Sequence, residues 1–129
     1  MNDSRIGLNQ DVINSVKVTC SKILELDGNI RFVGRIKDRK LLSFVRRNDS
    51  KPLLSEELAN LSHYQISVKA NMERMFDVAL GNTNWMITSK DKVKLITVFL
   101  DDGLLILSTE PEADHDTIIS EIQKMNTRL

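Results

Sequence analysis

The sequence predicts an α+β domain in which a five-stranded antiparallel sheet carries helices on both faces. The first observation behind this prediction is the order of the hydrophobic periods, which read helix, strand, strand, helix, three strands and helix. The second is the long middle helix, which separates a hairpin from the other three strands. We therefore expect the strand order 2-1-5-4-3, with the first and last helices on one face and the middle helix on the other.

The first helix is expected to begin after an N-cap at Asp11, because apolar residues then recur three and four positions apart. Gly28 ends this helix, since glycine readily takes the positive φ of a helix C-terminus. The period then changes to two, and residues 30–37 alternate apolar side chains with mostly cationic ones. A turn at residues 37–40 and a return strand at 41–45 complete a hairpin with one apolar and one cationic face.

The middle helix is the longest predicted element, and it runs from Ser55, a capping residue, to Leu80. Its main stripe consists of Leu58, Leu61, Gln65, Val68, Met72, Met75 and Ala79, and further apolar residues lie outside it. A helix that is apolar on more than one side is usually covered on both, once by its own sheet and once by another molecule. The pattern predicts a homodimer with Tyr64, Ile66, Ala70 and the edge-strand residue Trp85 in its interface.

Three strands and a last helix follow the middle helix. Asp101-Asp102-Gly103 is a tight-turn sequence between the last two strands, and Asp114 or Asp116 is the expected cap of the C-terminal helix. The predicted strands cover residues 85–87, 92–100 and 104–109.

Length and composition predict one globular domain, at residues 11–129, after a flexible N-terminus at residues 1–10. No apolar run approaches the roughly 20 residues of a membrane span, and the polar first residues do not form a secretory signal. Cys20 is the only cysteine and can form no intrachain disulfide, which fits a cytoplasmic protein.

The element order, with its long middle helix, resembles the roadblock/dynein-light-chain fold, a relative of the longin and profilin-like modules. Two segments, ELDGNIRFVG at residues 25–34 and EPEADHD at 110–116, are also similar to an uncharacterised family of small cytoplasmic proteins from ammonia-oxidising archaea. The roadblock resemblance implies a homodimer formed by middle helices and edge strands, and a role as scaffold or regulator, often beside a small GTPase. Roadblock hairpins commonly have glycine in the first β-turn, where this chain has Asp38-Arg39-Lys40.

The sequence offers no catalytic residue, cofactor site or metal site. Cys20 is best explained as a small buried hydrophobe, and the adjacent His63 and Tyr64 as partly buried packing residues. The acidic cluster at 110–116 matches neither an EF-hand nor a zinc motif, and carboxylates are expected at a helix start. No glycine-rich phosphate-binding sequence or nucleophile elbow occurs, so we expect a protein that is not an enzyme.

Charge is distributed unevenly, although 18 basic and 18 acidic residues balance. The first hairpin region is strongly cationic, whereas residues 101–116 carry acidic residues and no lysine or arginine. Opposite blocks of charge can steer an encounter with a partner, but cations on a hairpin can also merely protect an edge from aggregation. On the first interpretation the partner-binding residues are Arg31, Arg35, Lys37, Arg39 and Lys40.

Three classes of function remain open. The leading hypothesis is a homodimeric scaffold or regulatory module that binds a protein partner, which the resemblance implies to be a small GTPase. The second is a small-molecule sensor with its ligand between sheet and helix, which a closed core without a cavity would contradict. The third is a nucleic-acid binder working through the first hairpin, which the lack of aromatic residues on the cationic face disfavours.

Overall fold

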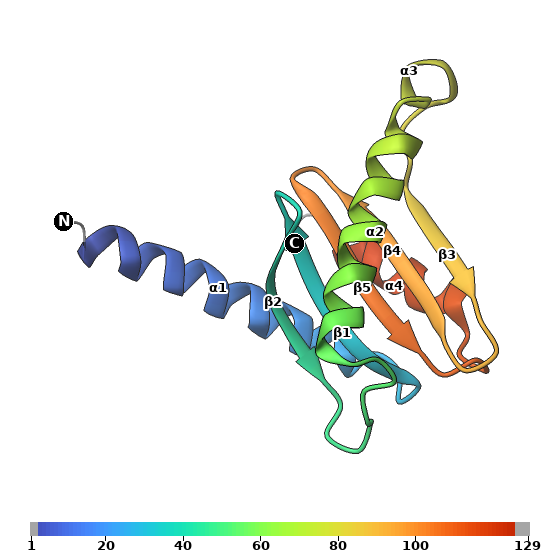
Figure 1. Ribbon diagram of the computed structural model, residues 1–129, viewed down its shortest axis with the longest axis horizontal. Coiled ribbons are helices and arrows are strands. Elements are labelled where there is room, and N and C mark those ends of the chain that lie inside the picture. Colours follow the sequence, from blue (N-terminus) through green and yellow to red (C-terminus); the bar gives the residue numbers. More distant parts are fainter. Residues whose placement is uncertain (1–2, 126–129) are drawn as a thin grey trace.

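The computed structural model describes residues 3–125, and side chains from residue 10 onward. It contains one five-stranded antiparallel sheet in the expected order β2-β1-β5-β4-β3 (Figure 1). The inner strands are β1, β5 and β4, as the sequence predicts. The strands are β1 (Ile30–Lys37), β2 (Lys40–Arg46), β3 (Trp85–Ser89), β4 (Lys94–Leu100) and β5 (Gly103–Thr109). The helices are α1 (Asp3–Leu24), α2 (Glu56–Arg74), α3 (Asp77–Leu80) and α4 (His115–Met125).

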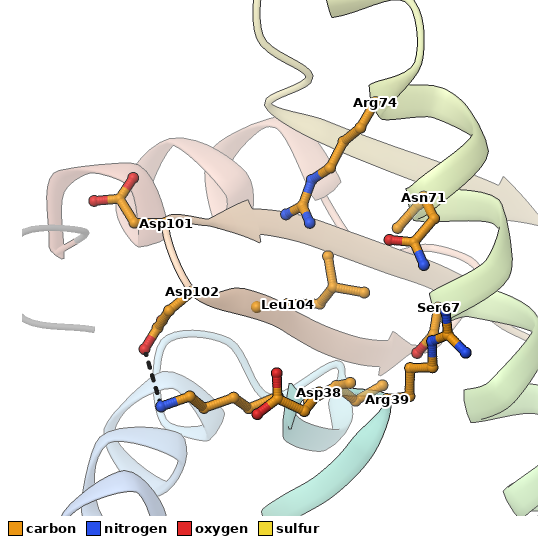
Figure 2. A pocket seen from close by; sticks show the side chains of 12 residues that line it. Asp38, Arg39, Ser67, Asn71, Arg74, Asp101, Asp102 and Leu104 are labelled. Atoms are coloured by element: carbon orange, nitrogen blue, oxygen red, sulfur yellow. Dashed lines mark ion pairs between the residues drawn. The ribbon is translucent and has the colours of Figure 1, made fainter.

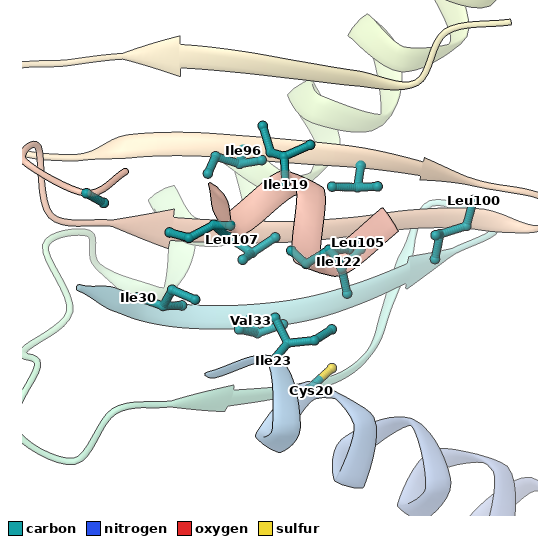
Figure 3. Packing of buried hydrophobic residues seen from close by; sticks show 13 residues of the cluster. Cys20, Ile23, Ile30, Val33, Ile96, Leu100, Leu105, Leu107, Ile119 and Ile122 are labelled. Atoms are coloured by element: carbon teal, nitrogen blue, oxygen red, sulfur yellow. The ribbon is translucent and has the colours of Figure 1, made fainter. Parts of the chain in front are cut away.

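Helices cover both faces of the sheet, as expected. Figure 1 shows α2 crossing one face diagonally while α4 lies behind the other, and α1 extends well past the sheet beside β2. The larger core lies between the sheet and the pair α1 and α4, and it joins Cys20 and Ile23 of α1, Ile119 and Ile122 of α4 and the inner strands in one buried cluster (Figure 3). A smaller core lies under α2 and consists of Phe32, Ile36, Ala70, Phe99, Leu104 and Ile106.

The expected N-cap at Asp11 is wrong. Helix α1 begins at Asp3, so Asp11 lies inside it and residues 3–10 continue the helix. Residues 1–2 of the predicted N-terminal segment and residues 126–129 of the predicted domain lie outside the described residues.

Arg47 stabilises the other end of α1. Its Nη2 donates to the carbonyl oxygens of Leu24 and Asp27 at 2.6 and 3.0 Å, and its Nε donates to Ile30 at 2.7 Å. The last carbonyl groups of a helix have no partner within the helix, and a cation there also complements the helix dipole. One side chain of the cationic segment is therefore part of the fold.

Strand β1 departs from the expected division into one apolar and one cationic face. An irregularity in its pairing with β5, between Ile30 and Phe32, shifts the alternation. Ile30 and Val33 pack against α1 and α4, whereas Phe32 and Ile36 lie on the α2 side. Because β1 is an inner strand with helices over both faces, both of its faces are buried.

The β1–β2 hairpin turns over two residues, Asp38 and Arg39, at φ +52° and +67°. Positive φ at both central residues is the hairpin geometry whose twist matches the strands, and it usually selects asparagine and glycine. This chain has a charged residue at both positions, and the positive φ makes the backbone there less favourable than it would be with glycine.

The middle helix begins as predicted, with the Ser55 hydroxyl accepting a hydrogen bond of 3.2 Å from the backbone N–H of Leu58. It does not run unbroken to Leu80, because the chain leaves α2 after Arg74 and forms the short α3 before Gly81 at φ +91°. The last helix is capped by Asp114, whose carboxylate accepts from both the backbone and the hydroxyl of Thr117.

Candidate interaction surfaces

Helix α2 presents its small residues to the sheet, which overturns one of the expected interface residues. Ala70 is 1% exposed, so its expected place in a dimer interface is wrong. Ile66 is partly buried against the same core under α2, and its place in an interface stays a prediction. His63, Ser67 and Ala70 are spaced four and three residues apart and share one side of the helix. This side of the helix faces the sheet.

The main apolar stripe of α2 faces away from the sheet. A helix advances about 100° per residue, so this stripe lies on the opposite side from Ala70. Met72 is 60% exposed, and the other apolar members of the stripe on α2 are also exposed: Leu58, Leu61 and Val68. We call these four residues the outer stripe. Tyr64 lies beside it and is exposed.

The exposed apolar surface continues beyond α2. Met75 and Phe76 at the break, and Val78 and Leu80 of α3, are all exposed. Trp85 starts β3, an edge strand whose outer side pairs with no strand in the described part of the chain. Monomeric proteins rarely expose large apolar patches, and such patches mark interaction sites. Two expected interface residues, Tyr64 and Trp85, thus remain accessible.

The cationic hairpin divides into paired and free residues. Arg35 is 5% exposed and donates to Asp102 and, at 2.9 Å, to the carbonyl oxygen of Ile36. Arg31 forms an ion pair of 2.7 Å with Glu110 and donates to the carbonyl oxygen of Lys51 at 2.7 Å. Neither guanidinium group is free to meet a partner, and both hold neighbouring segments together.

The exposed cations gather at the hairpin tip. Lys37, Arg39 and Lys40 are exposed, and the Lys37 Nζ lies 3.7 Å from an Asp102 oxygen. The tip residues Asp38 and Arg39 and the C-terminal part of α2 line a polar hollow of about 350 Å³ (Figure 2). Asp101 and Arg74 also line this hollow, so it carries charges of both signs.

The ion pairs Arg35–Asp102 and Arg31–Glu110 were not predicted from the sequence, although they follow from the predicted strand order. In that order β5 lies antiparallel to β1. The acidic residue before β5, Asp102, must then lie beside the end of β1, and Glu110 after β5 must lie beside its start. The two blocks of opposite charge therefore partly neutralise each other within one chain.

A larger cavity of about 620 Å³ lies under the N-terminal half of α2. Phe32 and Ile106 belong to the sheet side, Ala59 and His63 come from α2, and the β2–α2 loop contributes Leu53. The Phe32 ring stacks on Phe44 and on His63, at centroid distances of 5.5 and 5.9 Å. The wall is mostly apolar, with polar groups at a few positions.

The positively charged side chains that line this cavity lower the pKa values of their neighbours. The Arg46 guanidinium lies 5.1 Å from the centre of the Phe32 ring, and no carboxylate among the described side chains pairs with it. Burial lowers the pKa of Arg46, and the charge of Arg31 lowers it further. Burial likewise lowers the pKa of His63, with the charge of Arg46 as the second cause. The cavity is therefore electropositive.

Cys20 and the possible metal ligands do not form a site in the described structure. The Cys20 thiol is 1% exposed, and burial raises its pKa to about 11. Among the side chains of residues 10–125, no three histidine, cysteine or carboxylate groups gather closely enough to hold a metal ion. None of the described helices is long and apolar enough to cross a membrane.

Solved structures with the same fold share little sequence with this chain. The gliding protein MglB from Thermus thermophilus has a TM-score of 0.71 at 14% identity, over 89% of this chain and 84% of that one. MglB from Myxococcus xanthus has a TM-score of 0.68 at 12% identity, over 90% and 85%. A Roadblock/LC7 domain from Streptomyces avermitilis has a TM-score of 0.66 at 13% identity, over 84% and 88%.

No protein-family model matches the sequence, and no curated protein does so either. At these identities the structural similarity establishes the fold alone. The chain has a roadblock-like fold, as the order of its elements predicted.

Proposed function

We propose that this protein is a non-enzymatic, homodimeric interaction module of the roadblock type. The observation that carries the proposal is the outer stripe of α2, which is apolar, exposed and on the opposite side of the helix from the sheet. A second copy would cover this stripe by packing its own α2 against it. The edge strand β3, with the exposed Trp85, would extend the contact around a two-fold axis.

Self-association is in keeping with the structural relatives. One solved MglB structure that matches this chain, with a TM-score of 0.64 at 14% identity over 90% of each chain, is described as having a tetrameric arrangement. That description belongs to the other protein. For this chain the physical argument is the cost of leaving the outer stripe in water, about 25 cal/mol for each Å² of apolar surface.

The partner surface in this proposal is the hairpin tip, with Lys37, Arg39 and Lys40 as its cations. All three side chains are exposed, and only Lys37 has an ion-pair partner, Asp102, among the described side chains. Arg39 has a positive φ, a backbone conformation that glycine adopts more easily. An acidic protein surface would be attracted to this tip. The roadblock resemblance suggests a small GTPase as that partner. Arg31 and Arg35 contribute only by holding the hairpin in place.

Light scattering coupled to size exclusion tests the self-association. We expect the mass of two chains at tens of micromolar, and the mass of one chain for Val68→Glu combined with Met72→Glu. Ser120→Glu combined with Gln123→Glu is the matched control, since it adds the same two charges at exposed positions of α4 on the other face. A monomeric wild type, or a dimer that survives both stripe substitutions, would contradict the proposal.

A second experiment addresses the partner. Wild type and the variant Lys37→Glu plus Lys40→Glu are used as bait in extract from the native cell, and retained proteins are identified by mass spectrometry. We expect a small GTPase to be retained by wild type and lost from the variant, while Lys22→Glu on α1 keeps it. Identical proteins on all three baits would place the partner surface elsewhere.

A further inference from the structure

The cavity under α2 has the size and the chemistry of a small-molecule site. Its volume of about 620 Å³ lies within the range of ligand pockets, roughly 300–1,000 Å³. Leu53 and Leu54 of the β2–α2 loop line it on one side, and Val93 and Leu95 of the β3–β4 region line it on another. The space therefore extends beneath the helix between two separate parts of the sheet.

The polar groups of the cavity identify the kind of ligand. Arg46, Arg31 and Lys90 are cationic, and Glu56 is the only carboxylate among the described lining residues. Arg31 is already neutralised by Glu110, whereas Arg46 has no carboxylate partner among the described side chains. A half-buried guanidinium without a counter-ion is costly, and an incoming anion would satisfy it with a charge-assisted hydrogen bond.

We propose that this cavity binds a small organic anion with an apolar body, such as a free medium-chain carboxylate, with the carboxylate at Arg46 and the chain against Phe32, Leu53 and Ile106. The apolar walls take up the chain, and the aromatic stack of His63, Phe32 and Phe44 forms a rigid surface for it. This site is separate from the outer stripe, which lies on the far side of the helix. It does not depend on the proposed self-association.

Isothermal titration calorimetry with three probes tests each part of the proposal. Decanoate carries both the chain and the charge, 1-decanol carries the chain alone, and acetate carries the charge alone. We expect decanoate to bind, 1-decanol to bind about tenfold more weakly, and acetate to show no heat, because one charge-assisted hydrogen bond separates the first two. Equal affinity for decanoate and 1-decanol, or no binding of decanoate, would overturn the proposal.

Two variants test whether the probes bind in this cavity. Arg46→Gln should remove the preference for decanoate over 1-decanol, whereas Lys17→Gln, which removes one exposed cation from α1, should leave that preference unchanged. Ala59→Phe fills the cavity from α2 and should abolish binding of both probes. If Ala59→Phe fails to fold, Arg46→Gln alone decides, and a retained preference for decanoate in that variant would refute the site.

The titration of His63 supplies an independent readout. Burial is the main cause that lowers the pKa of His63, and the charge of Arg46 is the second. An anion that neutralises Arg46 and adds a negative charge near His63 should therefore raise that pKa. NMR titration of the His63 ring with and without decanoate measures the shift, and His115 on the other face serves as the internal control. An unchanged His63 pKa at saturating decanoate would place the probe elsewhere and overturn the proposal.

Discussion

Arg35 on β1 and Asp102 in the β4–β5 turn form an ion pair in which the cation is buried and the carboxylate is exposed. The turn fits closely around this contact. A Cβ at the next residue, Gly103, would lie 2.2 Å from the carbonyl oxygen of Ile36 and 2.5 Å from an Arg35 nitrogen. The pair therefore fixes the end of β1 against the start of β5, and a residue that the sequence placed on a binding surface belongs to the framework.

Replacing the carboxylate of this pair should destabilise the protein. Asp102→Ala leaves the Arg35 guanidinium buried without its counter-ion, and we expect the free energy of unfolding to fall by about 1 kcal/mol, a modest value because Asp102 faces solvent. Urea denaturation measures the change. Asp101→Ala is the matched control in the same turn and should stay within about 0.5 kcal/mol of wild type. Equal effects of the two substitutions would show that the pair contributes nothing.

The same pair predicts a dependence on pH. The hydrogen bond from Arg35 is the main cause that lowers the pKa of Asp102 in the folded protein. A folded-state pKa below the unfolded value gives stability that is present above the unfolded pKa and is lost as pH falls through the folded one. The difference between wild type and Asp102→Ala should therefore shrink as the pH falls below the ordinary aspartate pKa of 3.8. Urea denaturation at a series of pH values tests this, and a constant difference would contradict it.

A carboxylate on the sheet side of α2 should destabilise the protein much more than one on the solvent side. Ala70→Glu places a carboxylate in the core under α2 and should lower the free energy of unfolding by roughly 3 kcal/mol. Met72→Glu, two residues on, faces solvent and should change it by less than about 1 kcal/mol. Urea denaturation measures both, at protein concentrations low enough that self-association does not contribute. Similar losses for the two variants would mean that the helix is rotated about its axis.

The hairpin turn should accept glycine with a gain in stability. Arg39 holds φ at +67°, where a side chain costs about 1 kcal/mol that glycine does not incur. Arg39→Gly should raise the free energy of unfolding by about that amount. Lys40→Gly at the first position of β2 is the control and should lower it, because glycine weakens a strand. Thermal unfolding distinguishes the two, and a destabilised Arg39→Gly would show that its side chain makes a stabilising contact.

Cys20 should resist alkylation in the folded protein. Burial raises the pKa of its thiol to about 11, so almost no thiolate is present near neutral pH. Iodoacetamide should label the native protein slowly and the urea-unfolded protein rapidly, as followed by mass spectrometry. Rapid labelling under native conditions would mean that α1 leaves the sheet easily.

Several features followed from the sequence because their causes are local. The caps at Ser55 and Asp114 depend on a hydroxyl or a carboxylate placed just before a helix. Cys20 lies on the apolar side of an amphipathic helix, and its burial needed no further information. The strand order followed from the sequence of periodic segments along the chain, so the architecture was predictable before any packing was known.

The tertiary structure decided which side of each element is used. Helix α2 is apolar on two sides, and periodicity cannot say which one meets the sheet. In the folded chain the side with Ser67 and Ala70 is buried against the sheet, and the outer stripe turns to solvent. The register irregularity after Ile30 likewise set which side chains of β1 face α2 and which face α1 and α4. These outcomes depend on contacts between residues far apart in the chain, which no local pattern contains.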